Sequence, residues 1–361
     1  MLQSRLCFAM AESVSQIPID ILAVLGLLLL ALFGIAYWAK RREKNTAVSS
    51  DTSLLKQKRP WPIRILRLLL FGIFAFLVID VILTVYLSYQ TAANELAPAH
   101  HTVETPSDLT LPIEEITFEG GDDLTMAGWY VPPQNGAVII LLHGYGGDRR
   151  GMLWHGEHLY KAGYGLLMYD ERASGESEGE LRSYGWQDPA DVVGALRFLQ
   201  SKSEVDSDLI GIAGCSIGGQ IALQGTVYNP EIQAVWADGS ATIRAKDIPF
   251  RWNFVYMLAF PSNYLIDWLM AQKLDMEIPP AMIDIIGNIE PRPIVLVGGG
   301  QPHPIFGTEG ERMERFADFA GENTEVWVIE EATHCDGPNF IPDEYANRMV
   351  SFFDEAFAFV E

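Results

Sequence analysis

Short runs of apolar residues alternate with polar, glycine-rich segments through the C-terminal two thirds of the chain. Such runs, bounded by turn residues, are typical of strands that are buried on both faces. Segments with helical spacing of apolar residues follow several of them, so the pattern predicts an α/β fold with a mostly parallel, doubly wound sheet. The predicted strands are Val138–Leu142, Gly165–Tyr169, Asp208–Ala213, Val235–Ala237, Ile294–Val297 and Glu325–Ile329.

Other segments complete this picture. A strand pair is expected over residues 113–118 and 124–131, joined by a turn rich in Gly and Asp. Helices are expected over residues 148–162, 188–202 and 342–359. In a doubly wound sheet, functional residues gather at the carboxyl ends of the strands, so the candidate chemistry is sought there.

Two long apolar runs lie nearer the N-terminus, at residues 17–39 and 68–89. Each is long enough to cross a hydrocarbon core of about 30 Å, and the first exceeds the apolar region of a cleaved signal peptide. Nine basic and two acidic residues lie between them, and short basic loops stay cytoplasmic. We therefore predict a membrane anchor over residues 1–89, with two transmembrane helices, at the cell membrane. Asp80 inside the second run has no explanation in the sequence.

This topology places the rest of the chain on the extracytoplasmic side. Residues 90–110 are polar and read as a linker, followed by a domain over residues 111–361. The whole chain has 361 residues and a formal net charge of −22, but from Thr91 onward 15 Lys and Arg face 42 Asp and Glu. Such an acidic surface is repelled by nucleic acid, so no nucleic-acid partner is expected.

The segment Gly214–Gly218 carries the most specific chemical signal. It has the form Gly-x-Ser-x-Gly directly after a predicted strand and before a helical segment. On such a sharp turn the hydroxyl of Ser216 is exposed at the top of the sheet, and the next backbone N–H, that of Ile217, faces a developing oxyanion. The pentapeptide also recurs by chance as an ordinary glycine-rich connection.

The order of motifs around Ser216 resembles the α/β-hydrolase fold family from about residue 111 to the C-terminus. The matching motifs are His143-Gly144-Tyr145-Gly146-Gly147, the turn Asp170–Ser177, and a histidine, His334, after the last strand. Ala173 stands where that family usually has glycine. The resemblance implies His334 as general base, with the N–H groups of Tyr145 and Ile217 as the oxyanion hole. It also implies a helical cap over residues 241–290, a segment rich in aromatic residues.

The orienting acid departs from the family pattern. His303 stands where an aspartate is expected, and an imidazole cannot supply a carboxylate's negative charge. We rank Glu309 first as the acid, followed by Asp238 and then Glu311. Each of the three is also explained as a helix N-terminal or loop carboxylate.

The cysteines give little information. Cys215 and Cys335 adjoin the candidate nucleophile and base, so a disulfide between them is conceivable, but we favour free cysteines that pack as small apolar residues. No spacing indicates zinc, and we expect neither a metal nor a cofactor.

We therefore predict a membrane-anchored serine hydrolase that cleaves ester or thioester bonds of small or acyl substrates. A serine peptidase of the prolyl-oligopeptidase type is the enzymatic alternative. A catalytically silent membrane receptor or scaffold with the same fold is the alternative from another class, because fold alone does not decide function.

Overall fold

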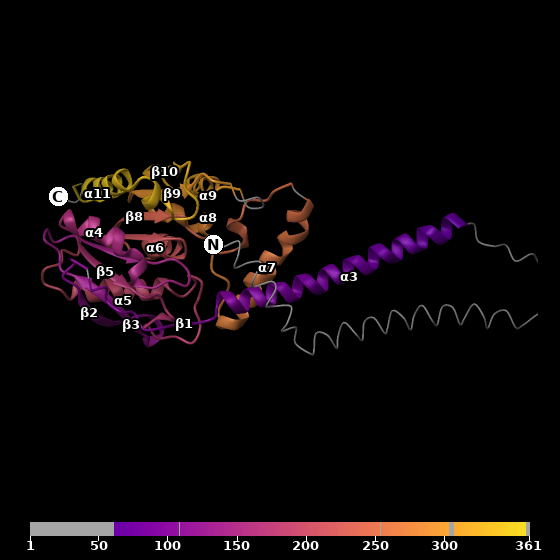
Figure 1. Cartoon of the computed structure of the whole chain (residues 1–361), viewed down its shortest axis with the longest axis horizontal. Helices are drawn as coiled ribbons and strands as arrows, with labels where there is room; N and C mark the ends of the chain where they lie inside the picture. The colour runs from indigo at the N-terminus through magenta and orange to yellow at the C-terminus, as the bar shows by residue number, and fades with distance from the viewer. Residues whose placement is uncertain (1–60, 108, 253, 303–306, 359–361) are drawn as a thin grey trace, which may run out of the picture. The chain divides into compact units, whose positions relative to one another are not determined.

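The computed structural model describes residues 61–107, 109–252, 254–302 and 307–358 (Figure 1). The first predicted transmembrane run, the basic segment 40–59, Cys7 and His303 lie outside these ranges. The second apolar run falls in helix α3, Trp61–Glu95, whose long series of apolar side chains is exposed. Among the described residues, α3 is the one helix that is long and apolar enough to cross a membrane. The anchor of two helices therefore stays a prediction.

A sheet of eight strands organises the rest of the described chain, with the order β10-β9-β8-β7-β4-β5-β3-β2. β2 and β3 form the predicted antiparallel pair, β3 also runs antiparallel to β5, and every other pairing is parallel. The predicted α/β fold with a mostly parallel sheet is confirmed. The strands are β2 Glu114–Glu119, β3 Thr125–Val131, β4 Val138–Leu142, β5 Gly165–Tyr169, β7 Ile210–Cys215, β8 Ile232–Asp238, β9 Ile294–Gly299 and β10 Thr324–Ile329.

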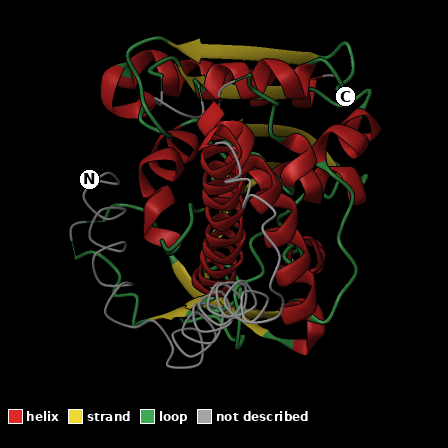
Figure 2. Ribbon diagram, turned by 90° about the vertical axis from the view of Figure 1, so that its right-hand side faces the viewer, coloured by secondary structure: helices red, strands yellow, loops and turns green. Residues whose placement is uncertain are grey.

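Helices cover both faces of this sheet (Figure 2), because its strands are apolar on both sides. One buried cluster joins the sheet to α5 and α6, and a second joins it to α4 and α11. The bounds are η3 Arg149–Met152, α4 Leu153–Lys161, α5 Pro189–Gln200, α6 Ile217–Tyr228, α9 Glu309–Ala317, α10 Gly337–Phe340 and α11 Pro342–Ala358. The expected helices lie close to these positions.

The insertion after β8 is helical, as the resemblance implied. Its elements are η4 Ala245–Asp247, α7 Phe254–Leu274, α8 Met282–Ile285 and η5 Ile286–Ile289. The buried carboxylate of Asp247 ties the two ends of the insertion together, since it accepts hydrogen bonds from the backbone N–H groups of Ile243 and Met282, each at 3.0 Å.

Residues 90–110 differ from the free linker that their polarity suggested. Leu96 and Val103 are buried, and β1, Ala99–His100, pairs with β6, Ser174–Gly175. The ring of His101 also bonds to Asp148 at 2.8 Å. The segment is therefore held against the sheet domain by backbone pairing and by a few side chains, and a composition average over twenty residues does not detect such contacts.

Candidate active site

Ser216 lies on a sharp turn between β7 and α6. Its backbone has φ 60° and ψ −117°, a conformation that L-residues rarely adopt and that is found at strained functional turns. The two flanking glycines are required by close backbone contacts. A Cβ on Gly214 would lie 2.3 Å from the carbonyl of Gly218, and a Cβ on Gly218 would lie 2.3 Å from the carbonyl oxygen of Leu142.

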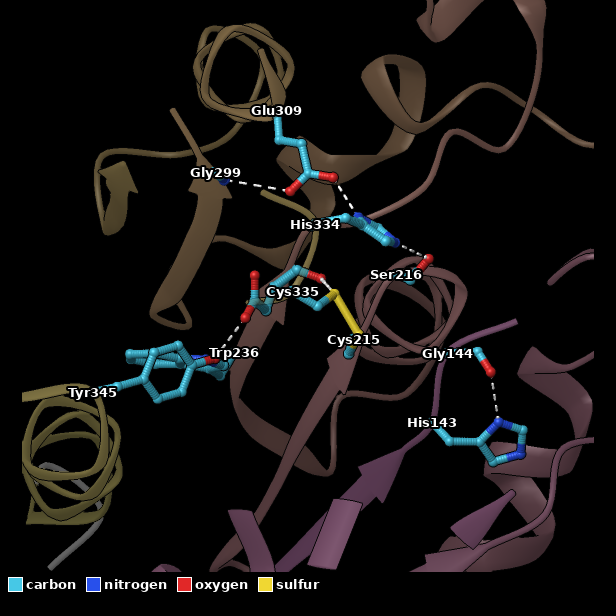
Figure 3. Close-up of a disulfide and its surroundings, with 12 residues drawn as sticks. His143, Gly144, Cys215, Ser216, Trp236, Gly299, Glu309, His334, Cys335 and Tyr345 are labelled. Carbon is cyan, nitrogen blue, oxygen red and sulfur yellow. Dashed lines mark hydrogen bonds and ion pairs between the residues drawn. A yellow bond between two sulfur atoms is a disulfide. The ribbon is translucent and has the colours of Figure 1, made fainter. Parts of the chain in front are cut away.

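His334 and Glu309 meet Ser216 from two later segments of the chain (Figure 3). His334 lies in the loop after β10, and its Nε2 is 2.8 Å from Ser216 Oγ. Its Nδ1 is hydrogen-bonded to Glu309 Oε1, while Glu309 Oε2 accepts from the backbone N–H of Gly299 at 3.3 Å. A hydroxyl, an imidazole and a carboxylate thus form one continuous line of hydrogen bonds.

The charges and hydrogen bonds among these three side chains raise the basicity of the His334 imidazole. The hydrogen bond to Glu309 is the main cause that raises the pKa of His334, against a smaller opposing effect of burial. Burial alone would raise the pKa of Glu309, but the hydrogen bond to His334 and the charges of His334 and Arg312 outweigh it, so this pKa is lowered. Glu309 therefore stays ionised and stabilises a proton on His334.

Gly239 gives these side chains their space. It follows β8 with φ 55°, and a Cβ there would lie 3.0 Å from Nδ1 of His334 and 3.1 Å from Oε2 of Glu309. Arg312 holds the same turn from the other side, because its guanidinium donates to the carbonyls of Ser240 at 2.9 Å and Gly239 at 3.3 Å. Neither Gly239 nor Arg312 was predicted from the sequence, although Arg312 is one helical turn from Glu309.

The two other candidate acids point elsewhere. Asp238 is buried and accepts a hydrogen bond from the hydroxyl of Tyr345 at 2.9 Å. Burial is the main cause that raises its pKa to about 7. Glu311 belongs to the N-terminal capping box of α9 with Thr308 and pairs with Arg251. Neither carboxylate has a hydrogen bond to His334 among the described contacts.

The loop after β4 also lies close to Ser216. A Cβ on Gly144 would lie 3.5 Å from that of Ser216, so the backbone that leads to Tyr145 lies beside the nucleophile. The Tyr145 side chain is turned to Arg182, whose guanidinium lies 4.0 Å from the centre of its ring. Ile217 begins α6, where the unpaired N–H groups of a helix favour negative charge.

Cys215 and Cys335 form a disulfide with Cα atoms 6.0 Å apart, which corrects the expectation of two free thiols. The 120 residues between the two cysteines follow no spacing rule, and the sequence signal for the pairing was that each cysteine adjoins a candidate catalytic residue.

The turn Asp170–Ser177, one of the motifs shared with α/β-hydrolases, is held by structural contacts. The buried Asp170 carboxylate pairs with Arg149 at 2.7 Å and accepts the N–H of Glu176 at 2.9 Å. Within the described ranges, no group of three or more His, Cys, Asp or Glu side chains is placed to hold a metal ion.

Known proteins resemble parts of the chain, and one of the matches includes Ser216 but ends before Glu309 and His334. A sequence model of the X-Pro dipeptidyl-peptidase (S15) family matches residues 81–253. The protein YfhR of Salmonella typhimurium, described as uncharacterized, is 27% identical over 154 residues, which are 41% of this chain and about half (51%) of that protein. YfhR of Escherichia coli O157:H7 is 25% identical over 290 residues, which are 77% of this chain and 92% of that protein.

Two further proteins extend these similarities to hydrolases. The thiohydrolase aneE of Aspergillus aculeatus is 28% identical over 127 residues, which are 34% of this chain and 39% of that protein. The solved structure of the Pyrococcus furiosus esterase Pf2001 has a TM-score of 0.58 at 23% identity and covers 72% of this chain and 98% of that one. Together with the sheet topology, the similarity to this structure shows that the chain has the α/β-hydrolase fold.

Proposed function

We propose that this chain is a membrane-tethered serine hydrolase that cleaves ester or thioester bonds of small or acyl substrates. The observation that carries the proposal is the 2.8 Å contact between Ser216 Oγ and His334 Nε2, in an imidazole held by Glu309. This arrangement matches what an activated serine needs: a base within hydrogen-bond reach, and a third group that orients the base. The esterase and thiohydrolase named above support the choice of bond.

The proposed reaction follows from this geometry. His334 accepts the proton of Ser216 as the serine oxygen attacks the substrate carbonyl. The backbone N–H groups of Tyr145 and Ile217 stabilise the oxyanion that forms. His334 then passes the proton to the leaving alcohol or thiol, which leaves an acyl group on Ser216, and water releases this group by the same route. Glu309 orients His334 and stabilises its protonated form throughout.

Two small pockets near the start of the insertion after β8 support short substrate groups, although Ser216 itself lines neither of them. One, of about 120 Å³, is lined by Thr242, Ile248 and Arg251, and a second, of about 140 Å³, by Thr242, Tyr184 and Met270. Both pockets are lined by Thr242, and the preceding residue, Ala241, donates its N–H to the carbonyl of Ser216 at 3.0 Å. Pockets for drug-sized ligands usually measure about 300–1,000 Å³, so each of these suits a short acyl or leaving group.

A serine peptidase of the prolyl-oligopeptidase type is the second candidate, and the match to the X-Pro dipeptidyl-peptidase family favours it. Ester and amide hydrolysis use the same nucleophile, base and acid, so the three side chains do not separate these reactions. A silent receptor or scaffold with this fold is the remaining alternative. The bonded line from Ser216 to Glu309 argues against it, because a scaffold has no need of an oriented base.

Hydrolysis assays separate the three possibilities. We expect the full chain in detergent to hydrolyse p-nitrophenyl esters of short acids faster than those of long acids and faster than X-Pro p-nitroanilides. Ser216→Ala removes this activity and leaves the unfolding temperature unchanged. Faster cleavage of the anilides would favour the peptidase. Equal rates of hydrolysis by the wild-type protein and by Ser216→Ala would favour the scaffold.

The proposed location is the cell membrane, with the catalytic domain on the extracytoplasmic side. Helix α3 and the basic residues that precede it support this orientation. Protease added to intact cells should remove the catalytic domain from the anchor. Digestion only after permeabilisation would reverse the orientation, without bearing on the chemistry at Ser216.

A further inference from the structure

The Cys215–Cys335 disulfide joins the residue before the nucleophile to the residue after the base (Figure 3). Cys215 is the last residue of β7 and precedes Ser216 directly. Cys335 follows His334 in the loop between β10 and α10. One covalent bond therefore links the two segments that bring Ser216 and His334 together.

The loop that carries His334 is held mainly by side-chain contacts. The side chain of His334 is 48% exposed, and the residues on both sides of it are exposed or half-buried. Among the described residues, no backbone N–H of Thr333, His334 or Cys335 donates to another backbone carbonyl. Exposed backbone without such hydrogen bonds opens easily, so this loop depends on side-chain contacts for its position.

The Ser216 side is rigid by contrast. β7 is a central strand that pairs with β4 on one side and β8 on the other. The N–H of Ser216 donates to the carbonyl of Asp238 at 2.8 Å. The disulfide thus attaches an exposed loop to a strand that is paired on both sides.

We infer that Cys215 and Cys335 are a positioning pair that holds His334 within reach of Ser216, and that catalysis depends on their oxidised state. This inference rests on the proposed function. Reduction by a phosphine breaks the S–S bond and gives two thiols, while the phosphine becomes its oxide with oxygen from water. Glu309 still bonds to His334 after reduction, but the loop is no longer tied to β7.

The inference also agrees with the proposed location. Structural disulfides persist in oxidising compartments and are rare in the cytosol. Both cysteines are half-buried, so a small reductant in solution has access to the bond.

The experiment uses the full chain with Cys7→Ser, so that thiol titration counts only the bridge. The oxidised protein should show no free thiol, and the protein treated with tris(2-carboxyethyl)phosphine should show two. Ester hydrolysis, its pH profile and thermal unfolding are measured for both forms, and for Cys215→Ala/Cys335→Ala in the same background. The double variant is the control for effects of the phosphine itself.

We expect reduction to lower kcat about 10- to 100-fold, because a displacement of about 1 Å of a catalytic group has an effect of this size. KM should change less than kcat, since the bridge does not line either pocket. Reoxidation should restore the rate, and the phosphine should not affect the double variant. If the disulfide only stabilises the fold, its reduction will lower the unfolding temperature but leave kcat unchanged at temperatures well below unfolding.

An unchanged kcat in fully reduced, folded enzyme overturns the inference, even if the double variant fails to fold. That result leaves the proposed function intact as long as Ser216→Ala is inactive. Activity that survives Ser216→Ala overturns the proposed function instead.

Discussion

His143 and His334 follow parallel strands at the same edge of the sheet, yet their surroundings give them opposite properties. His143 is buried, its Nδ1 is 2.9 Å from the carbonyl of Gly144, and its Nε2 accepts the N–H of Glu171 at 3.0 Å. Burial is the main cause that lowers the pKa of His143. His334 is half-exposed, and the bond to Glu309 raises its pKa.

The difference shows that the end of a strand places an imidazole at the edge of the sheet. Its hydrogen-bond partners determine whether it shapes a loop or can exchange a proton. Both nitrogens of His143 are bonded to backbone groups, so it fixes the shape of a loop. Nε2 of His334 faces a hydroxyl, and Nδ1 faces a carboxylate that can stabilise a proton. Four predictions test this comparison.

Replacing each histidine by alanine should have the largest effect. We expect His334→Ala to lower kcat by about 10⁴- to 10⁶-fold, as loss of the base does in serine hydrolases, with little change in stability. His143→Ala leaves the buried N–H of Glu171 unpaired, which destabilises the fold by about 1–3 kcal/mol. Ester hydrolysis and urea unfolding separate the two effects. A collapse of kcat in a stable His143→Ala protein would contradict the comparison.

The identity of the acid gives the next effect. Glu309→Gln removes the charge beside His334 and should lower kcat by about 100- to 10,000-fold. Asp238→Asn is the matched control, since an amide oxygen can still accept the hydroxyl of Tyr345, and we expect a change of kcat of only a few-fold. If the control lost activity and Glu309→Gln kept it, the acid would be Asp238.

The pH dependence of kcat/KM follows from the raised pKa of His334. The base must be neutral, so activity rises with pH through this pKa, and the acidic limb should lie above the usual histidine value of 6.5. In Glu309→Gln the residual activity should have its acidic limb at lower pH, because the stabilising charge is gone. A limb at the same pH in both proteins would show that Glu309 does not act on His334.

The last prediction concerns stability rather than catalysis. The pKa of Asp238 is raised to about 7 in the fold from 3.8, so the folded state binds more protons between these values. Stability therefore falls as the pH rises from about 4 to 7, and Asp238→Asn should remove this fall of about 4 kcal/mol, at about 1.4 kcal/mol for each unit of the pKa difference. Urea unfolding at several pH values measures this pH dependence. The same dependence of stability on pH in the wild-type protein and in Asp238→Asn would contradict the prediction.

The sequence was most informative where local geometry dictates residue type. The serine turn needs small residues at 214 and 218 because backbone lies 2.3 Å from where their Cβ atoms would be, and this need is visible as a motif. The strands were predictable because burial on both faces demands apolar runs. Glu309 was ranked first from its place after β9, and the structure puts it beside His334.

Contacts between distant segments were not predictable in this way. The disulfide joins positions 120 residues apart, and no rule of spacing connects them. Arg312 and Gly239 support the site through backbone carbonyls and a positive φ, which leave no motif in the chain. The docking of β1 on β6 likewise rests on tertiary contacts of a polar segment.

The central claim is that His334 activates the hydroxyl of Ser216. Its most direct test is to treat the full chain with a fluorophosphonate and to locate the adduct by peptide mass spectrometry. The account predicts one adduct per chain on Ser216, no adduct in Ser216→Ala, and labelling slowed by orders of magnitude in His334→Ala. Folded wild-type protein that is unlabelled, or labelled equally fast without His334, would contradict it.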